Sequence, residues 1–181
     1  MGGCESPGSV ISWVLLSYRL PREPSTPRIA LWRRLRRLGA VQIGDGLVGL
    51  PADARTREQL DWLAEEVLEA GGSAGVWLAE SGSRAQDHAL ARELALARAA
   101  EYVELTAVAT AAAAMKGADR VKILRRVRKQ LREITRRDFF PPPERDAATA
   151  AVGALAAGAP MSAGAGDVDR AALEHSTGAG S

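Results

Sequence analysis

The order of strand-like and helix-like segments over residues 10–80 constrains the fold of this chain more than any other feature. The first segment, Val10–Leu20, is apolar and β-rich and stops at Pro21, so we expect a buried strand. Three leucines then recur at helical spacing before Gly39, which predicts a helix of about three turns. These leucines are Leu31, Leu35 and Leu38.

Two short β runs, a second helix and a last strand follow in the same segment. The β runs lie within Val41–Leu50 on either side of Asp45-Gly46, a pair that favours the positive φ of a tight hairpin. The spacing of Thr56 and Gln59 is that of a capping box, which predicts that an amphipathic helix begins there. The apolar run Ala74–Ala79 is expected to be the last strand.

The resulting order, β-α-β-β-α-β, predicts an α+β fold: a ferredoxin-like sandwich over residues 10–80, with two helices on one face of an antiparallel sheet. Right-handed crossover connections leave few other ways to assemble these segments. Because a core of about 70 residues is marginal, we expect the helices that follow to pack against it.

The rest of the chain is predicted to be mainly helical. An Ala-rich segment and a basic segment, separated near Gly117, are expected to form a long antiparallel helical hairpin over residues 84–140. Phe139 and Phe140 are expected to pin the end of this hairpin to the sandwich. The flanking segments are interpreted as a weak helix, a disordered C-terminal tail and a flexible leader, at residues 141–157, 158–181 and 1–9 respectively.

Basic and acidic residues are segregated along the chain, although the net charge is only +2. Residues 19–37 contain seven arginines and one glutamate, for a charge of +6. Residues 116–145 contain eleven basic and four acidic residues, for +7, which leaves −11 for the rest of the chain. Because local potential rather than total charge attracts phosphate, the two basic blocks indicate a polyanionic partner.

The candidate nucleic-acid-binding residues are the basic side chains expected on the exposed faces of two helices, since guanidinium groups match phosphate oxygens. They are Arg33, Arg34, Arg36 and Arg37 in the first block, and Lys122, Arg125, Arg126, Lys129, Arg132, Arg136 and Arg137 in the second. A second hypothesis stays open, in which these residues pair with acidic helices of this chain or of a partner, as a structural or protein-interaction module. The nearby acids are Glu65, Glu66, Glu69, Glu93, Glu101 and Glu104.

The residue types that catalysis or metal binding needs are scarce. Cys4 is the single cysteine and there are two histidines, His88 and His175, so we expect no disulfide, thiolate cluster or histidine-based centre. No nucleophile with a base and no carboxylate pair stands at a useful spacing. No apolar run approaches the roughly 20 residues that span a bilayer. We therefore expect a cytoplasmic protein that is not an enzyme and uses no cofactor or metal.

The four tryptophans lie on the apolar faces of the predicted elements. We therefore expect them to pack in the core rather than to stack on nucleic-acid bases. They are Trp13, Trp32, Trp62 and Trp77.

Four stretches of the sequence are distinctive as strings. They are Trp13-Val-Leu-Leu-Ser-Tyr-Arg-Leu-Pro-Arg-Glu-Pro-Ser25, Leu31-Trp-Arg-Arg-Leu-Arg-Arg-Leu-Gly39, Glu58-Gln-Leu-Asp-Trp-Leu-Ala-Glu-Glu66 and Arg136-Arg-Asp-Phe-Phe140. The first three resemble the N-terminal domain of the ChrB family of chromate resistance regulators, and the fourth resembles the segment that closes that domain. The resemblance covers about residues 12–140.

This resemblance implies a chromate-responsive transcriptional regulator that binds the promoter DNA of a chromate-efflux operon, with chromate as a possible effector. Because ferredoxin-like sheets and repressors commonly pair, we also expect a homodimer. The β-α-β-β-α-β region is similar, more distantly, to the Cas2-like domain also found in PaaX-type repressors. Cas2 nucleases typically place a metal-binding Asp after an aromatic residue at the end of the first strand. Here Arg19 follows Tyr18, so we rank a metal nuclease below both other hypotheses.

Overall fold

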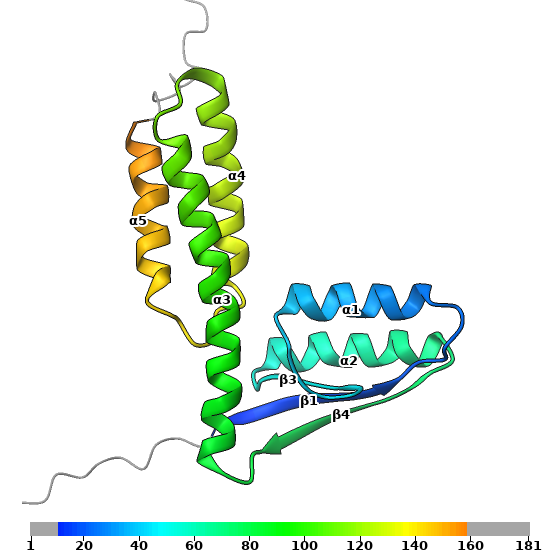
Figure 1. The fold of residues 1–181 in the computed structure, drawn as a ribbon. Coiled ribbons are helices and arrows are strands. Elements are labelled where there is room, and N and C mark those ends of the chain that lie inside the picture. Colours follow the sequence, from blue (N-terminus) through cyan, green and yellow to red (C-terminus); the bar gives the residue numbers. More distant parts are fainter. Residues whose placement is uncertain (1–10, 159–181) are drawn as a thin grey trace, which may run out of the picture.

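The computed structural model describes residues 11–158 and confirms the predicted α+β fold. Within these residues, four strands and five helices follow one another in the order β1-α1-β2-β3-α2-β4-α3-α4-α5 (Figure 1). The predicted leader, residues 1–9, and nearly all of the predicted tail, residues 158–181, lie outside the described range.

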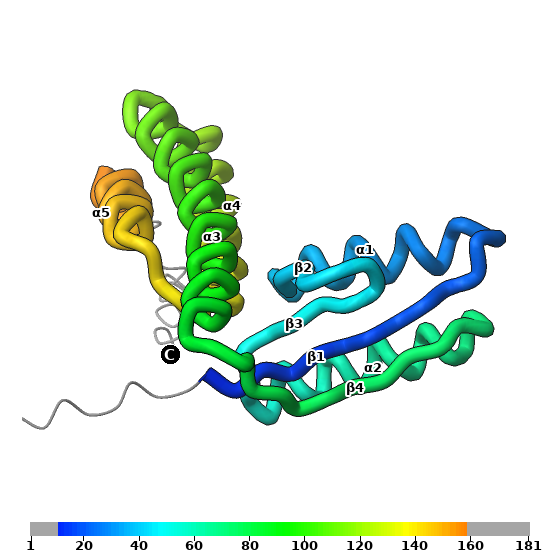
Figure 2. Tube along the Cα trace, turned by 60° about the horizontal axis from the view of Figure 1, so that its bottom comes forward, coloured from blue at the N-terminus to red at the C-terminus, as the bar shows by residue number. Residues whose placement is uncertain are grey.

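The strands form one antiparallel sheet in the order β2-β3-β1-β4, which is the ferredoxin-like arrangement. Helices α1 and α2 lie side by side over one face of this sheet (Figures 1 and 2). The strands are β1 (Ser12–Arg19), β2 (Val41–Gly44), β3 (Leu47–Pro51) and β4 (Ser73–Glu80), and the two helices are α1 (Thr26–Leu38) and α2 (Ala54–Glu69).

The core of the sandwich lies between the sheet and these two helices. Val14 and Leu16 of the central strand β1 are fully buried, because alternate side chains of a strand point to the same face. Leu35 of α1 and Leu60 and Leu63 of α2 belong to the same buried cluster. The predicted leucine stripe of α1 therefore packs against the sheet.

The turn between β2 and β3 falls at Asp45-Gly46, as predicted. Gly46 has a φ of 69°, and a Cβ at this position would overlap the carbonyl oxygen of Tyr18. The N–H of Tyr18 donates to the Gly46 carbonyl at 2.7 Å, which ties the turn to the end of β1. The position thus requires glycine for both its backbone conformation and its lack of a side chain.

Helix α2 begins earlier than predicted, because Asp53 caps it rather than Thr56. The Asp53 Oδ1 accepts from the Thr56 N–H at 2.6 Å, and the Thr56 hydroxyl accepts from the Asp53 N–H at 2.9 Å. Thr56 is thus the third helical residue of a reciprocal capping box, and the predicted pairing of Thr56 with Gln59 is wrong. A carboxylate is favoured here, since it faces the positive end of the helix dipole.

Three further helices form a bundle with a core of its own. The predicted hairpin of two long helices is confirmed, and a third helix packs against both of them. Tyr102, Leu105, Val127, Ile134 and Leu155 are all at most 1% exposed in this core. The helices are α3 (Arg84–Ala112), α4 (Gly117–Thr135) and α5 (Glu144–Ala157).

The bundle stands beside one end of the sandwich, with the first turns of α3 next to that end of the sheet (Figures 1 and 2). There Trp13 of β1 is buried with Val41 and Leu94, and its ring lies 6.4 Å from that of Phe140. Phe139 packs instead against the sandwich core. The two phenylalanines therefore pin the end of the hairpin, as predicted.

The prediction that all four tryptophans pack in the core is wrong for three of them. Trp13 is 2% exposed, whereas Trp32, Trp62 and Trp77 are 54%, 60% and 61% exposed. The leucines beside Trp32 and Trp62 already fill the narrow buried stripe of α1 and α2, so the indoles point outward. Trp77 follows Val76, which packs on the helix side, and so it lies on the opposite face of β4.

Candidate nucleic-acid interface

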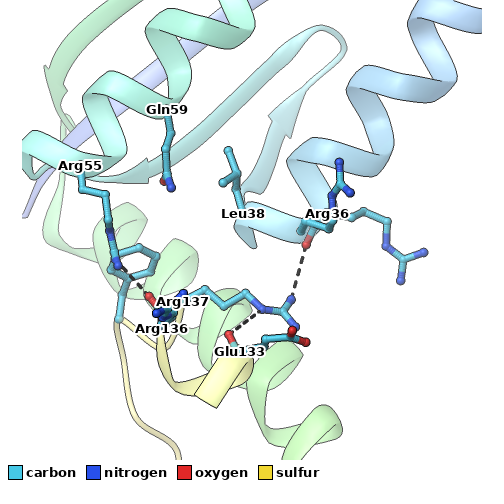
Figure 3. Close-up of a pocket in the computed structure, with 9 residues that line it drawn as sticks. Arg36, Leu38, Arg55, Gln59, Glu133, Arg136 and Arg137 are labelled. Carbon is cyan, nitrogen blue, oxygen red and sulfur yellow. Dashed lines mark hydrogen bonds between the residues drawn. The ribbon is translucent and has the colours of Figure 1, made fainter. Parts of the chain in front are cut away.

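A cleft of about 720 Å³ lies where the ends of α1 and α4 meet the beginning of α2 (Figure 3). Its wall is dominated by arginines from three segments that are distant in sequence. They are Arg36 and Arg37 of α1, Arg55 of α2, and Arg136 and Arg137 after α4. The two basic blocks of the sequence thus meet at one place in the fold.

Helix α1 presents its arginines because its buried positions are taken by leucines. Leu31 and Leu35 face the sheet, which leaves Arg33, Arg36 and Arg37 exposed. Two of these arginines lie in the last turn, where a cation interacts favourably with the negative end of the helix dipole. The helix ends directly afterwards at Gly39, whose φ is 74°.

Helix α4 extends the basic surface away from the cleft. Val127 and Ile134 are buried in the bundle, and the opposite face carries an exposed series of basic side chains. Because a helix rises about 1.5 Å per residue, the series spans about 20 Å. Its members are Lys122, Arg125, Arg126, Arg128, Lys129, Arg132 and Arg136.

Arg137 has a structural role at this junction. Its guanidinium donates to both carboxylate oxygens of Glu101, at 3.2 and 2.5 Å, and to the carbonyl of Arg36 at 3.5 Å. Glu101 also pairs with Arg98 at 3.0 Å. Arg137 therefore holds the end of α1 against the bundle, and the acid expected by the pairing hypothesis neutralises its charge.

Arg98 lies behind this ion pair and is 6% exposed. Burial lowers the pKa of its guanidinium, and the carboxylate of Glu101 opposes that shift. The guanidinium packs against Gly39, so that a Cβ at that position would overlap it. The end of α1 is thus fixed by a buried cation as well as by Arg137.

Two other candidate residues also have acidic partners. Arg34 pairs with Glu66 of α2, and Lys129 lies 3.8 Å from Glu133 of its own helix. Both pairs are exposed to solvent, where an ion pair contributes little to stability. The other eight candidates form no side-chain ion pair with any residue from 11 to 158. They are Arg33, Arg36, Arg37, Lys122, Arg125, Arg126, Arg132 and Arg136.

The sequence pattern did not identify Arg55 as part of the site. Arg55 donates through Nη2 to the carbonyl of Arg136 at 3.0 Å, across the cleft (Figure 3). It lies in the first turn of α2 only because Asp53 caps that helix. If Asp53 is recognised as the N-cap, Arg55 falls in the first turn of α2, which is the end of that helix nearest the other arginines.

The part of the chain that the structure describes contains neither a candidate metal site nor a candidate membrane span. No three His, Cys, Asp or Glu side chains between residues 11 and 158 gather in a way that could hold a metal ion. In the same range, no helix combines the length and apolar character needed to cross a membrane.

Together, the fold and the cleft define a ferredoxin-like α+β protein with a helical bundle and an arginine-rich surface at their junction. Residues 28–115 match the family described as Protein ChrB, N-terminal. Protein ChrB of Cupriavidus metallidurans is 33% identical over 135 residues, which are 72% of this chain and 41% of that relative. Residues 28–115 thus form a domain of the ChrB N-terminal type.

The chain spans about two fifths of the length of the curated relative that it matches. No solved structure matches it.

Proposed function

We propose that this chain is the DNA-binding part of a chromate-responsive transcriptional regulator, that it is not an enzyme, and that it binds the promoter of a chromate-efflux operon. The observation that supports the proposal is the meeting of two separate basic blocks at one cleft, with Arg36 and Arg37 on one side and Arg136 on the other. The family resemblance supplies chromate as the effector and a promoter as the target.

The shape of the basic surface favours a long polyanion over a small anion. The exposed series on α4 runs about 20 Å from the cleft, and phosphates of one DNA strand are spaced by about 3.4 Å per base pair. A 20 Å length of duplex therefore carries about six phosphates on each strand, many more charges than a small anion offers. Arginine and lysine contacts of this kind fix the protein on the backbone and do not read the base sequence.

We further propose that the regulator acts as a homodimer in the cytoplasm. A two-fold protein would present the basic surface twice, as operators with two half-sites require.

The pairing hypothesis is favoured by one contact, the double hydrogen bond between Arg137 and Glu101. It accounts for Arg137 and, more weakly, for Arg34 and Lys129. It gives no acidic partner within residues 11–158 to the remaining exposed basic side chains of α4. We therefore retain pairing as the role of Arg137 and propose DNA as the partner of the others.

Reversing four charges of α4 tests the proposal. The variant Arg125→Glu/Arg126→Glu/Lys129→Glu/Arg132→Glu changes exposed residues only, so its melting temperature should stay close to that of the wild type. We expect the wild type to shift DNA from upstream of its own operon at low salt, and the variant to lose that binding. Chromate should weaken the wild-type complex.

Retained DNA binding by the variant, or no binding by the wild type at low salt, would contradict the proposal. Unfolding of the variant or loss of its oligomer would support the pairing hypothesis instead.

A further inference from the structure

The arginine cleft is one of three connected depressions on the outer side of the α1–α2 layer. A second depression, of about 290 Å³, is lined by Trp62 with Arg34 and Arg37. A third, of about 310 Å³, is lined by Trp32 with Arg36 and Arg37. Arg37 lines all three, so the cleft and both tryptophans belong to one continuous surface.

The two tryptophans on this surface are more than half exposed, at 54% for Trp32 and 60% for Trp62. Trp32 lies under the guanidinium of Arg36, whose Cζ is 4.9 Å from the ring centroid. Large exposed indoles on a charged surface indicate a binding role, because burying them in a complex is favourable.

The surface thus combines two kinds of group that nucleic acids recognise. Arginines contact phosphates, and aromatic rings stack on the faces of bases. In an intact duplex the faces of the bases are covered by their neighbours, and only the edges are accessible in the grooves. A tryptophan can therefore stack only where bases have left the helix.

We propose that Trp32 and Trp62 stack on unpaired bases, so that this surface prefers nucleic acid with unstacked nucleotides over an intact duplex. The inference rests on the proposed function, since it assigns the tryptophans to the same DNA-binding surface. It reverses the role expected from the sequence, which placed both residues in the core.

Trp77 provides a matched control on the same protein. It is 61% exposed, close to Trp62, but it lies on the opposite face of the sheet from α1 and α2. Its Nε1 donates to the Ser17 hydroxyl at 3.2 Å, and it lines none of the three depressions. A general effect of removing an exposed indole would appear equally at Trp77.

The test measures affinity for three forms of one labelled DNA from the upstream region: single strand, intact duplex, and duplex with an internal unpaired loop. The variants are Trp32→Leu, Trp62→Leu and Trp77→Leu, since leucine keeps an apolar side chain but removes the ring face. We expect Trp32→Leu and Trp62→Leu each to weaken binding to the looped and single-stranded forms by about 5- to 150-fold. Binding to the intact duplex should change less than twofold, and Trp77→Leu should match the wild type.

Salt dependence separates stacking from phosphate contacts. Stacking releases no counterions, so Trp32→Leu should lower affinity without changing the slope of log K against log salt. Trp32→Phe should restore most of the lost affinity, because phenylalanine retains a ring face. Melting temperatures of all variants should match the wild type.

Equal affinities of wild type, Trp32→Leu and Trp62→Leu for the looped DNA would overturn the inference, as would an equal loss in Trp77→Leu. If the wild type still binds the intact duplex in that case, the proposed function stands and only the stacking role fails. If the wild type binds none of the three forms at low salt, the proposed function fails as well.

Discussion

At the scale of single residues, Gly39 connects the basic surface to the bundle. Its φ of 74° ends α1, and the space where a Cβ would be is occupied by the guanidinium of Arg98. Gly71 has nearly the same φ, 75°, but no atom within 4 Å of that space. Substituting each of the two glycines therefore distinguishes the cost of backbone strain from the cost of displacing a packed side chain.

We expect Gly39→Ala to destabilise the protein more than Gly71→Ala. The left-handed backbone costs about 1–2 kcal/mol in either variant, and Gly39→Ala must in addition displace Arg98 from Glu101. Urea unfolding of both variants measures the difference in the free energy of unfolding. Equal losses of unfolding free energy in the two variants would show that displacing Arg98 does not destabilise the protein.

The carboxyl group of Asp87 is expected to make the stability of the folded protein depend on pH. The Ser81 hydroxyl and the Trp13 Nε1 donate to its Oδ1, the latter at 2.8 Å, and these hydrogen bonds lower the pKa of the Asp87 carboxyl. A lowered pKa means that the stabilisation is complete above the pKa of an unfolded Asp, about 3.9, and is lost as pH falls through the lower folded pKa.

Asp87→Asn removes this titration while keeping an acceptor oxygen for Trp13. We expect the wild type to melt at a higher temperature than the variant, by a constant margin above about pH 5 that shrinks below about pH 4. Melting curves between pH 2 and 7 measure the margin. A margin that stays constant down to pH 2 would show that the carboxylate contributes no pH-dependent stability.

At the scale of elements, the sequence predicts most of the order of strands and helices, because hydrophobic period and turn residues are local signals. The Asp45-Gly46 turn and the leucine stripe of α1 are examples. The start of α2 was misplaced because both Asp53 and Thr56 are good capping residues, and only the hydrogen bonds distinguish them.

The sequence pattern of α5, the third helix of the bundle, is only weakly typical of a packed helix, although α5 contributes to the core. Half of the residues of helix α5 are alanine, yet Leu155 is fully buried and its carbonyl accepts from Nη2 of Arg120 at 3.0 Å. A few large side chains thus hold a helix whose sequence shows little amphipathic pattern.

We expect Leu155→Ala to lower the free energy of unfolding by about 2–5 kcal/mol, the range for a buried leucine whose site cannot fully collapse. Leu96→Ala, at an α3 position that is 59% exposed, should change it by less than about 0.5 kcal/mol. Urea unfolding followed by circular dichroism measures both. Similar values for the two variants would contradict the placement of α5 in the core.

At the scale of the whole molecule, Glu101 links the bundle to the sandwich through Arg98 and Arg137. All three side chains are less than one third exposed. We expect Glu101→Gln to destabilise the protein by about 1.5–3 kcal/mol, because two cations lose a charged acceptor. The exposed Glu104, which forms no ion pair with any residue from 11 to 158, supplies the control Glu104→Gln. Equal unfolding free energies for the two variants would exclude a linking role for Glu101.

The sequence predicts most of the residues of the candidate site, but it does not predict how they are arranged in space. Charge counting identifies Arg36 and Arg136 as members of basic blocks, because each block is continuous in sequence. Their meeting at one cleft depends on packing between segments about 100 residues apart, which no local pattern encodes. The exposure of Trp32 and Trp62 was missed for a related reason, since a helix in a two-layer sandwich buries only one narrow stripe.

The most direct test of the proposed DNA-binding surface is the salt dependence of duplex binding by the double variant Arg36→Ala/Arg136→Ala. The control is Arg84→Ala/Arg92→Ala, which removes two exposed α3 charges that do not line the cleft. Each phosphate contact that is lost should reduce the slope of log K against log salt by about one. We expect the slope of the cleft variant to fall by about two and that of the control to match the wild type. An unchanged slope in the cleft variant, or an equal change in the control, would contradict the assignment of DNA binding to this surface.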